Sequence, residues 1–226
     1  MKVFPTRRFF FDGFDAGTDQ RTLSGGTSLS GAADLIATDG GGVVTVEFTD
    51  PDLGDPDAAN AWSAIDVVSD GGAHAFIVPL TDAKHQQFGE ITTPVGGFPW
   101  WDEADFADTE PHALLNASAA LRATTLVVDV SALSGRLHEG IWLSIDHGAW
   151  RHRAYRIAEI VADDGLEATI KVRPPLREAT AQDTAVEFYD PKCTMRVDGS
   201  MRAPRSMGWA SSQGVRFIED FSGDYS

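Results

Sequence analysis

Residues 170–191 read IKVRPPLREATAQDTAVEFYDP, in which two runs of alternating apolar and polar residues flank the sequence RPPLR at 173–177. Alternation with a period of two is typical of β-strands. A proline lacks the N–H donor and pushes the residue before it to extended backbone, so the two prolines are expected to end the first strand. The segment therefore predicts β-structure, with Arg173 and Arg177 at the rim, placed to pair with acidic groups of this chain or of another.

The same pattern recurs along most of the chain and predicts a mainly β protein. The segments expected to form strands are residues 43–48, 73–80, 124–130, 141–145, 154–161, 168–172, 185–189 and 215–219.

One helix is expected. Asp55 is a suitable N-cap, Pro56 suits the first helical position, and Gly71 follows the last residue of the helical pattern. Residues 113–121 fit a short helix or a strand.

Two domains are expected. Residues 81–122 separate two parts of the chain, and much of this region shows neither the helical nor the strand period. A strand, the helix and a further strand precede it, and closely spaced strands follow it. We predict an N-terminal β-sandwich-like domain with one helix at 1–112, completed by 198–226. A small C-terminal β-barrel or β-sandwich domain occupies 113–197.

The composition narrows the functional classes. The chain has 18 basic and 34 acidic side chains, a net charge of −16, which argues against nucleic-acid binding because the phosphate backbone requires a cationic face. No apolar run is long enough to span a membrane. The N-terminal apolar stretch is interrupted at Asp12 and Asp15, so we expect no export by a signal peptide. The single cysteine, Cys193, lies in an alternating run and is expected to be a buried structural thiol.

The densest group of polar side chains is PWWDEADFADTEPH at 99–112. Its oxygen ligands suit calcium, but their spacing fits no calcium loop and the required glycine is missing. We interpret it as an acidic loop held against the body or a neighbouring subunit by Trp100, Trp101 and Phe106. Two alternatives stay open: a carbohydrate-binding module that stacks sugars on Trp100 and Trp101, and a glycoside hydrolase with carboxylates in this loop.

The remaining motifs of the sequence do not indicate an enzyme. His138, His147 and His152 fall in one hairpin, HEGIWLSIDHGAWRHR, and are interpreted as turn residues because nothing in the sequence supplies a complete metal site. Serine-nucleophile, P-loop and dinucleotide motifs are absent from the sequence. We expect no catalytic residues, no metal and no cofactor.

Several weak motifs occur together in a fixed order. GIWLSIDHGAWRHRAYRIAEIVADDG and ATIKVRPPLREATAQDTAVEFYDPKCTMRV resemble the C-terminal half of tail proteins from tailed bacteriophages and prophages. SGGTSLSGAADLIATDGGGVVTVEF, AWSAI and FADTEPHALLNASAALRATTLVV are similar to earlier parts of the same proteins. The resemblance covers the chain from about residue 21 to its end, and the order of the motifs carries it.

The resemblance implies a structural component of the tail tip or baseplate, a distal tail or minor tail protein. Such a protein would form a homo-oligomeric ring, a hexamer or a trimer, in the tail of the virion after synthesis in the bacterial cytoplasm. Its partners would be the tail tube, the hub and receptor-binding proteins. The residues expected at interfaces are Trp100, Trp101, Phe106, Arg173 and Arg177.

Overall fold

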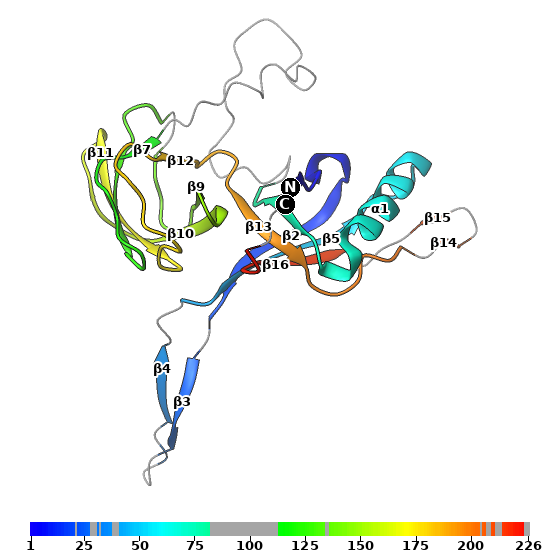
Figure 1. Ribbon diagram of the computed structural model, residues 1–226, viewed down its shortest axis with the longest axis horizontal. Coiled ribbons are helices and arrows are strands. Elements are labelled where there is room, and N and C mark those ends of the chain that lie inside the picture. The colour runs from blue at the N-terminus through cyan, green and yellow to red at the C-terminus, as the bar shows by residue number, and fades with distance from the viewer. Residues whose placement is uncertain are drawn as a thin grey trace, which may run out of the picture.

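The computed structural model shows two β-rich bodies side by side (Figure 1), and the residues it describes are 1–20, 22–27, 31, 33–37, 41–81, 113–133, 136–203, 205–206, 209–210 and 214–223. The chain is mainly β, as predicted, and α1 (Pro56–Ser69) is the one α-helix among these residues. None of the helices within the described ranges is both long and apolar enough to cross a membrane.

The first body is a six-stranded sheet that combines strands from both ends of the chain. In spatial order its strands are β1 (Lys2–Val3), β6 (Ala75–Pro79), β13 (Lys192–Val197), β16 (Val215–Glu219), β5 (Val43–Pro51) and β2 (Phe11–Asp19). The short β1–β6 pair is parallel and the other pairs are antiparallel. A 3-10 turn, η1 (Thr6–Arg8), separates β1 from β2.

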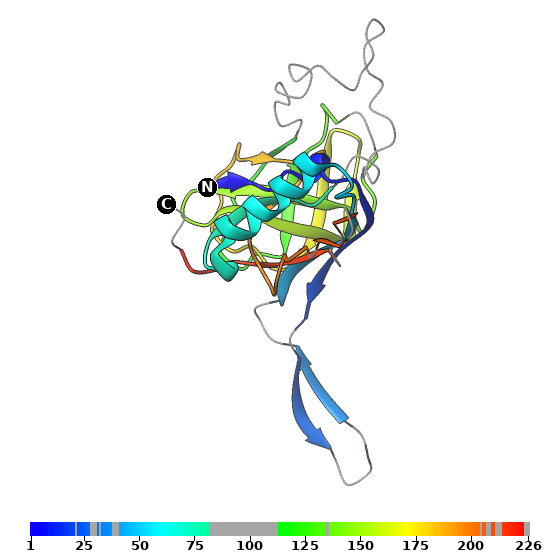
Figure 2. The ribbon, with the colours of Figure 1, turned by 90° about the vertical axis from the view of Figure 1, so that its right-hand side faces the viewer.

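The helix α1 packs across one face of this sheet, as Figure 2 shows with α1 in front of the strands. Its N-cap is Asp55, whose side chain accepts from the Ala58 amide, and Asp70 ends it in a left-handed conformation before the 3-10 turn η2 (Asp70–Gly72). The predicted helix and its N-terminal capping residues are therefore confirmed, whereas the left-handed C-cap is Asp70 and not the expected Gly71.

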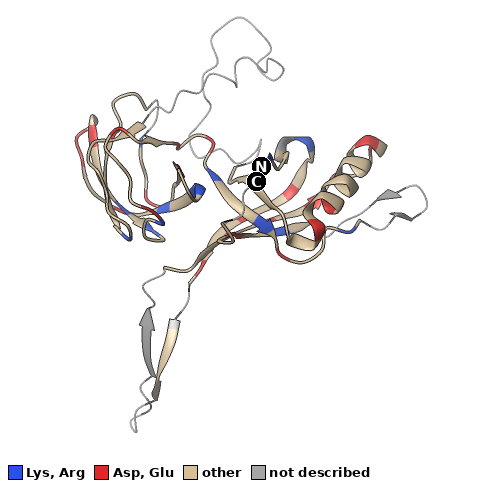
Figure 3. Ribbon diagram, viewed as in Figure 1, with Lys and Arg blue, Asp and Glu red and all other residues tan. Residues whose placement is uncertain are grey.

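Packing, more than charge, holds α1 in place. Acidic residues lie at both of its ends and no basic residue lies in it (Figure 3). With respect to the helix dipole, the carboxylate of Asp57 in the first turn stabilises the helix, whereas that of Asp70 at the C-terminal end destabilises it. Trp62 is fully buried, with its ring 5.0 Å from that of Phe9, and its Nε1 donates to the Met201 carbonyl. The aromatic core beneath the helix anchors it to the sheet.

The second body is a small barrel, nearly closed. Its strands, in spatial order, are β12 (Ala185–Val186), β7 (Ala113–Leu115), β8 (Thr125–Asp129), β11 (Glu167–Arg173), β10 (Arg151–Asp163) and β9 (Trp142–His147). A bridge between Ser144 and Glu187, with backbone hydrogen bonds of 2.9 Å in both directions, joins β9 to the chain just after β12. The barrel core forms a hydrophobic cluster separate from that of the first body.

The barrel is inserted between two neighbouring strands of the first sheet. β6 precedes it and β13 follows it, and these two strands pair directly, with Cys193 opposite Val78. Strand β13 therefore belongs to the first sheet, although the expected boundary at 197 assigned it to the barrel. The reason is that the polypeptide leaves the barrel at Asp190-Pro191, before the alternating run that contains Cys193 begins.

Two small hairpins complete the described structure. β3 (Thr22–Thr27) and β4 (Ala33–Ala37) pair antiparallel and form a separate sheet, which we call the hairpin arm. Figures 1 and 2 agree that the hairpin arm extends away from both bodies. β14 (Arg205–Ser206) and β15 (Trp209–Ala210) form the other hairpin.

Candidate functional site

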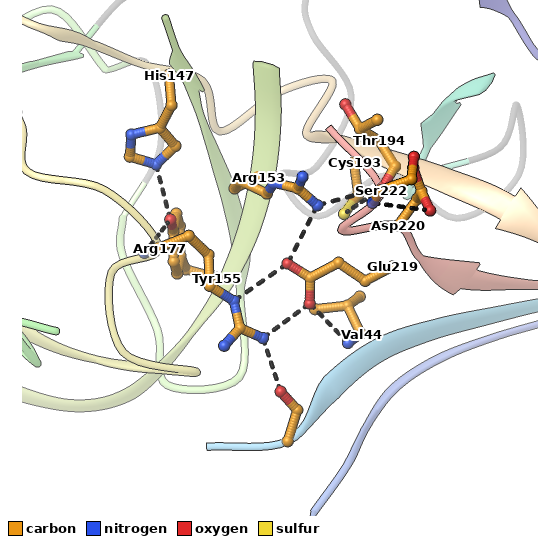
Figure 4. Close-up of polar contacts among 11 residues, drawn as sticks. Val44, His147, Arg153, Tyr155, Arg177, Cys193, Thr194, Glu219, Asp220 and Ser222 are labelled. Carbon is orange, nitrogen blue, oxygen red and sulfur yellow. Dashed lines mark hydrogen bonds and ion pairs between the residues drawn. The ribbon is translucent and has the colours of Figure 1, made fainter. Parts of the chain in front are cut away.

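The two bodies meet at a buried carboxylate, that of Glu219. In β16 the buried residues Val215, Phe217 and Glu219 alternate with more exposed ones, so the strand directs Glu219 toward the interior. A buried carboxylate requires partners of opposite charge or hydrogen-bond donors. Oε2 of Glu219 accepts from the Val44 amide at 3.1 Å (Figure 4).

Two arginines of the barrel body supply the remaining donors. Arg177 forms a fork, with Nη2 donating to Oε2 of Glu219 at 2.8 Å and Nε donating to Oε1 at 3.1 Å. Arg153, fully buried on β10, approaches Oε1 with Nη1 at 3.5 Å. We call Glu219, Arg153 and Arg177 the junction cluster; it joins the last strand of the first sheet to the barrel.

Aromatic rings cover the junction cluster. The Arg153 guanidinium lies 5.5 Å from the Trp150 ring centre and 4.9 Å from that of Phe221, and the Arg177 guanidinium lies 5.0 Å from the Phe221 ring. Cation–π contacts of this kind are stronger where water is excluded. Phe221, two residues after Glu219, thus contributes to both arginine environments from the C-terminal side.

The RPPLR segment is one of the parts of the barrel body that contact the first body. β11 ends at Arg173, which confirms that the prolines terminate a strand, and the Arg173–Pro174 peptide bond is cis. Pro174 and Pro175 are buried against Gly41, where an added Cβ would lie 2.2 Å from Cδ of Pro175. Gly41 also has φ +64°, so both the space and the backbone conformation there favour glycine.

A hydrogen-bonded chain anchors Arg177 to the barrel. The Arg177 amide donates to the Tyr155 hydroxyl at 3.0 Å, and that hydroxyl lies 2.7 Å from Nε2 of His147. The Tyr155 hydroxyl therefore connects the backbone of Arg177 with the buried ring of His147. Burial lowers the pKa of His147 to about 4 and raises the pKa of Tyr155, so both stay neutral near pH 7.

The interpretation of His147 and His152 as turn residues was wrong. His147 is the last residue of β9 and is buried, and His152 lies in β10 opposite Asp146; the turn occupies residues 148–150. The sequence Asp146-His147-Gly148 fits a tight turn, but the chain reverses two residues later. The described ranges contain no group of three or more His, Cys, Asp or Glu side chains that could hold a metal ion.

The other predicted site residues have different positions. Trp100, Trp101 and Phe106 lie outside the described residues. Arg173 is exposed at the end of β11. Arg177 was an interface candidate whose partner the sequence left open, and its guanidinium binds Glu219 and the Gly42 carbonyl within the chain, at 2.8 and 2.6 Å.

The sequence interpretation missed Glu219 and Arg153. Glu219 shares a two-residue spacing with Val215 and Phe217, and Arg153 shares one with Tyr155. A charged residue in register with buried apolar ones is a signal for a buried ion pair, although the spacing alone does not identify its partner. Cys193, in contrast, is fully buried as expected, and burial raises the pKa of its thiol to about 12.

The chemistry of the junction cluster is that of a structural ion pair. Both carboxylate oxygens of Glu219 accept from donors on the barrel body, and one of them also accepts from β5, so the group connects three parts of the chain.

No protein-family model matches this sequence, and no curated protein matches it.

Proposed function

We propose that this protein is a structural component of a phage or phage-like tail tip. It assembles with further copies of itself into a ring that links the tail tube to the hub and receptor-binding proteins. The proposal is supported by the ordered motifs between residues 140 and 197, which resemble phage tail proteins, and by one structural observation, the hairpin arm.

The hairpin arm is a surface suited to a neighbouring subunit. A two-stranded hairpin is at best marginally stable by itself in water. Leu23, which lies opposite Ile36 in the β3–β4 register, is 61% exposed. Docking of this apolar side chain on another copy would bury it, and repetition of one such contact by rotation closes a ring.

Further contacts are proposed from the sequence. Trp100, Trp101 and Phe106 supply the aromatic side chains that commonly contribute much of the binding energy at protein interfaces. Arg173 is exposed and available to pair with an acidic group of a neighbouring subunit.

Light scattering coupled to size-exclusion chromatography tests the proposal. We expect the wild-type chain to assemble in a concentration-dependent manner and Leu23→Asp to reduce assembly. Leu166→Asp is the matched control, because Leu166 is 67% exposed but lies in the β10–β11 turn of the barrel and not on the hairpin arm. A strictly monomeric wild-type chain at every concentration, together with its absence from purified particles, would refute the proposal.

A further inference from the structure

The root of the hairpin arm, where β2 ends and β5 begins, is hydrogen-bonded to residues of the junction cluster. β2 and β5 pair as far as Asp19 and Val43, and the hairpin arm lies in the connection between them. At this root, the Gly42 carbonyl accepts from Nη2 of Arg177 at 2.6 Å. The Val44 amide donates to Glu219 at 3.1 Å, two residues further along the chain.

Both sides of the root are close to each other and to the barrel. An added Cβ at Gly42 would lie 2.3 Å from the Asp19 carbonyl oxygen, so the end of β2 touches the start of β5. Gly41 is in contact with Pro174 and Pro175 in the same way. A displacement of the root therefore cannot occur without a change at the RPPLR segment.

On the barrel side, the same segment is tied to the core. The Leu176 amide donates to the Ala123 carbonyl at 2.9 Å, and the Arg177 amide donates to the Tyr155 hydroxyl at 3.0 Å. Arg177 thus holds the barrel with its backbone and the root of the hairpin arm with its side chain.

We propose that Arg177 and Glu219 couple the position of the root of the hairpin arm to the orientation of the barrel, so that a protein that displaces the root also turns the barrel. Each body has its own hydrophobic cluster, although Trp142 of β9 and Ala154 of β10 belong to that of the first body, and two ion pairs to Glu219 also link the bodies. Bodies joined in this manner move relative to each other more readily than parts of one core. This coupling is a property of the single chain and does not depend on a role in a phage tail.

A coupling between two sites is reciprocal. Loss of the Arg177 side chain should loosen the root of the hairpin arm. A change at the root should in turn loosen the barrel around Arg177, although no barrel residue has been altered.

Distance measurement between spin labels tests the first half. Nitroxides attached at Gln20→Cys at the root of the hairpin arm and Val161→Cys on the barrel use two exposed positions, and the buried Cys193 stays unlabelled. We expect Arg177→Met and Glu219→Gln to broaden the distance distribution of the labelled chain. Arg173→Met, an exposed arginine four residues away, is the matched control and should leave it unchanged.

Amide hydrogen exchange tests both halves. Arg177→Met should make the Val44 amide exchange about tenfold faster, the factor expected when a hydrogen bond to a charged group is weakened. Gly41→Ala, which would clash with Pro175, should accelerate exchange of the Leu176 and Arg177 amides. Gly17→Ala is its control, since an added Cβ there meets nothing within 4 Å.

The two measurements together decide whether the root of the hairpin arm and the barrel are coupled. Broader distances in both junction variants, with faster exchange at Leu176 and Arg177 in Gly41→Ala, support the coupling. Unchanged distances in folded Glu219→Gln, or exchange in Gly41→Ala that matches Gly17→Ala, would overturn it. Glu219→Gln keeps the side-chain volume, and circular dichroism before each measurement confirms that a variant is folded.

Discussion

Replacement of Glu219 by alanine isolates the energetic contribution of the junction cluster. The carboxylate accepts hydrogen bonds from Arg177, Arg153 and the Val44 amide, and its side chain has no exposure to solvent. Alanine would leave two guanidinium groups at the junction without this acceptor. Removal of one partner from a buried ion pair costs about 3–5 kcal/mol, because the remaining charge stays poorly hydrated.

The lower end of that range is expected here. The Arg177 side chain is 12% exposed, so its guanidinium can recover part of its hydration, whereas the Arg153 side chain is completely buried. We therefore expect Glu219→Ala to lower the free energy of unfolding by about 3 kcal/mol. For a chain of 226 residues this corresponds to a fall in Tm of about 6–12 °C.

Urea unfolding followed by circular dichroism measures the effect and its origin. Arg177→Met alone should cost about 2 kcal/mol, and the double variant should cost less than the sum of the single ones by about 1–3 kcal/mol. Lys171→Met is the control: the Lys171–Glu159 contact is short, at 2.7 Å, but both side chains are about half exposed, so its loss should cost less than about 1 kcal/mol. Strict additivity of the two junction variants, or a Glu219→Ala effect no larger than that of Lys171→Met, would show that the ion pair does not stabilise the fold.

Three further predictions concern the interior. Trp62→Phe keeps an aromatic ring beneath α1 but leaves the Met201 carbonyl without its donor, so urea unfolding should show a loss of about 1–3 kcal/mol. Burial lowers the pKa of His147 to about 4, so only the unfolded chain takes up this proton as the pH falls below about 6.5; stability measured against pH should decline between these values, and less so in His147→Gln. Cys193 should not react with a thiol reagent at pH 8 until the chain is unfolded in urea, since the side chain is buried and its thiol pKa is raised to about 12.

Local sequence patterns predicted the elements that depend on local chemistry. Asp55-Pro56 defined the start of α1, and the strand at 215–219 was predicted with its observed bounds, because capping and alternation are properties of neighbouring residues. β2 was missed because its sequence, FDGFDAGTD, contains two glycines and three aspartates, which strands usually disfavour. It nevertheless forms nine residues of edge strand, since pairing with β5 overrides the local preference.

The partner of Arg177 was not accessible from local patterns. The sequence placed this arginine at the rim of a strand and left open whether it pairs within the chain or with a neighbour. Glu219 lies 42 residues away, across the connection from the barrel back into the first sheet. The choice is decided only when β13 and β16 pair, because that pairing brings the end of β16 against the barrel. A buried acid at the end of a predicted strand, together with an arginine after a strand-ending proline pair, is then best treated as one candidate ion pair, because each charge requires a partner that its own segment does not supply.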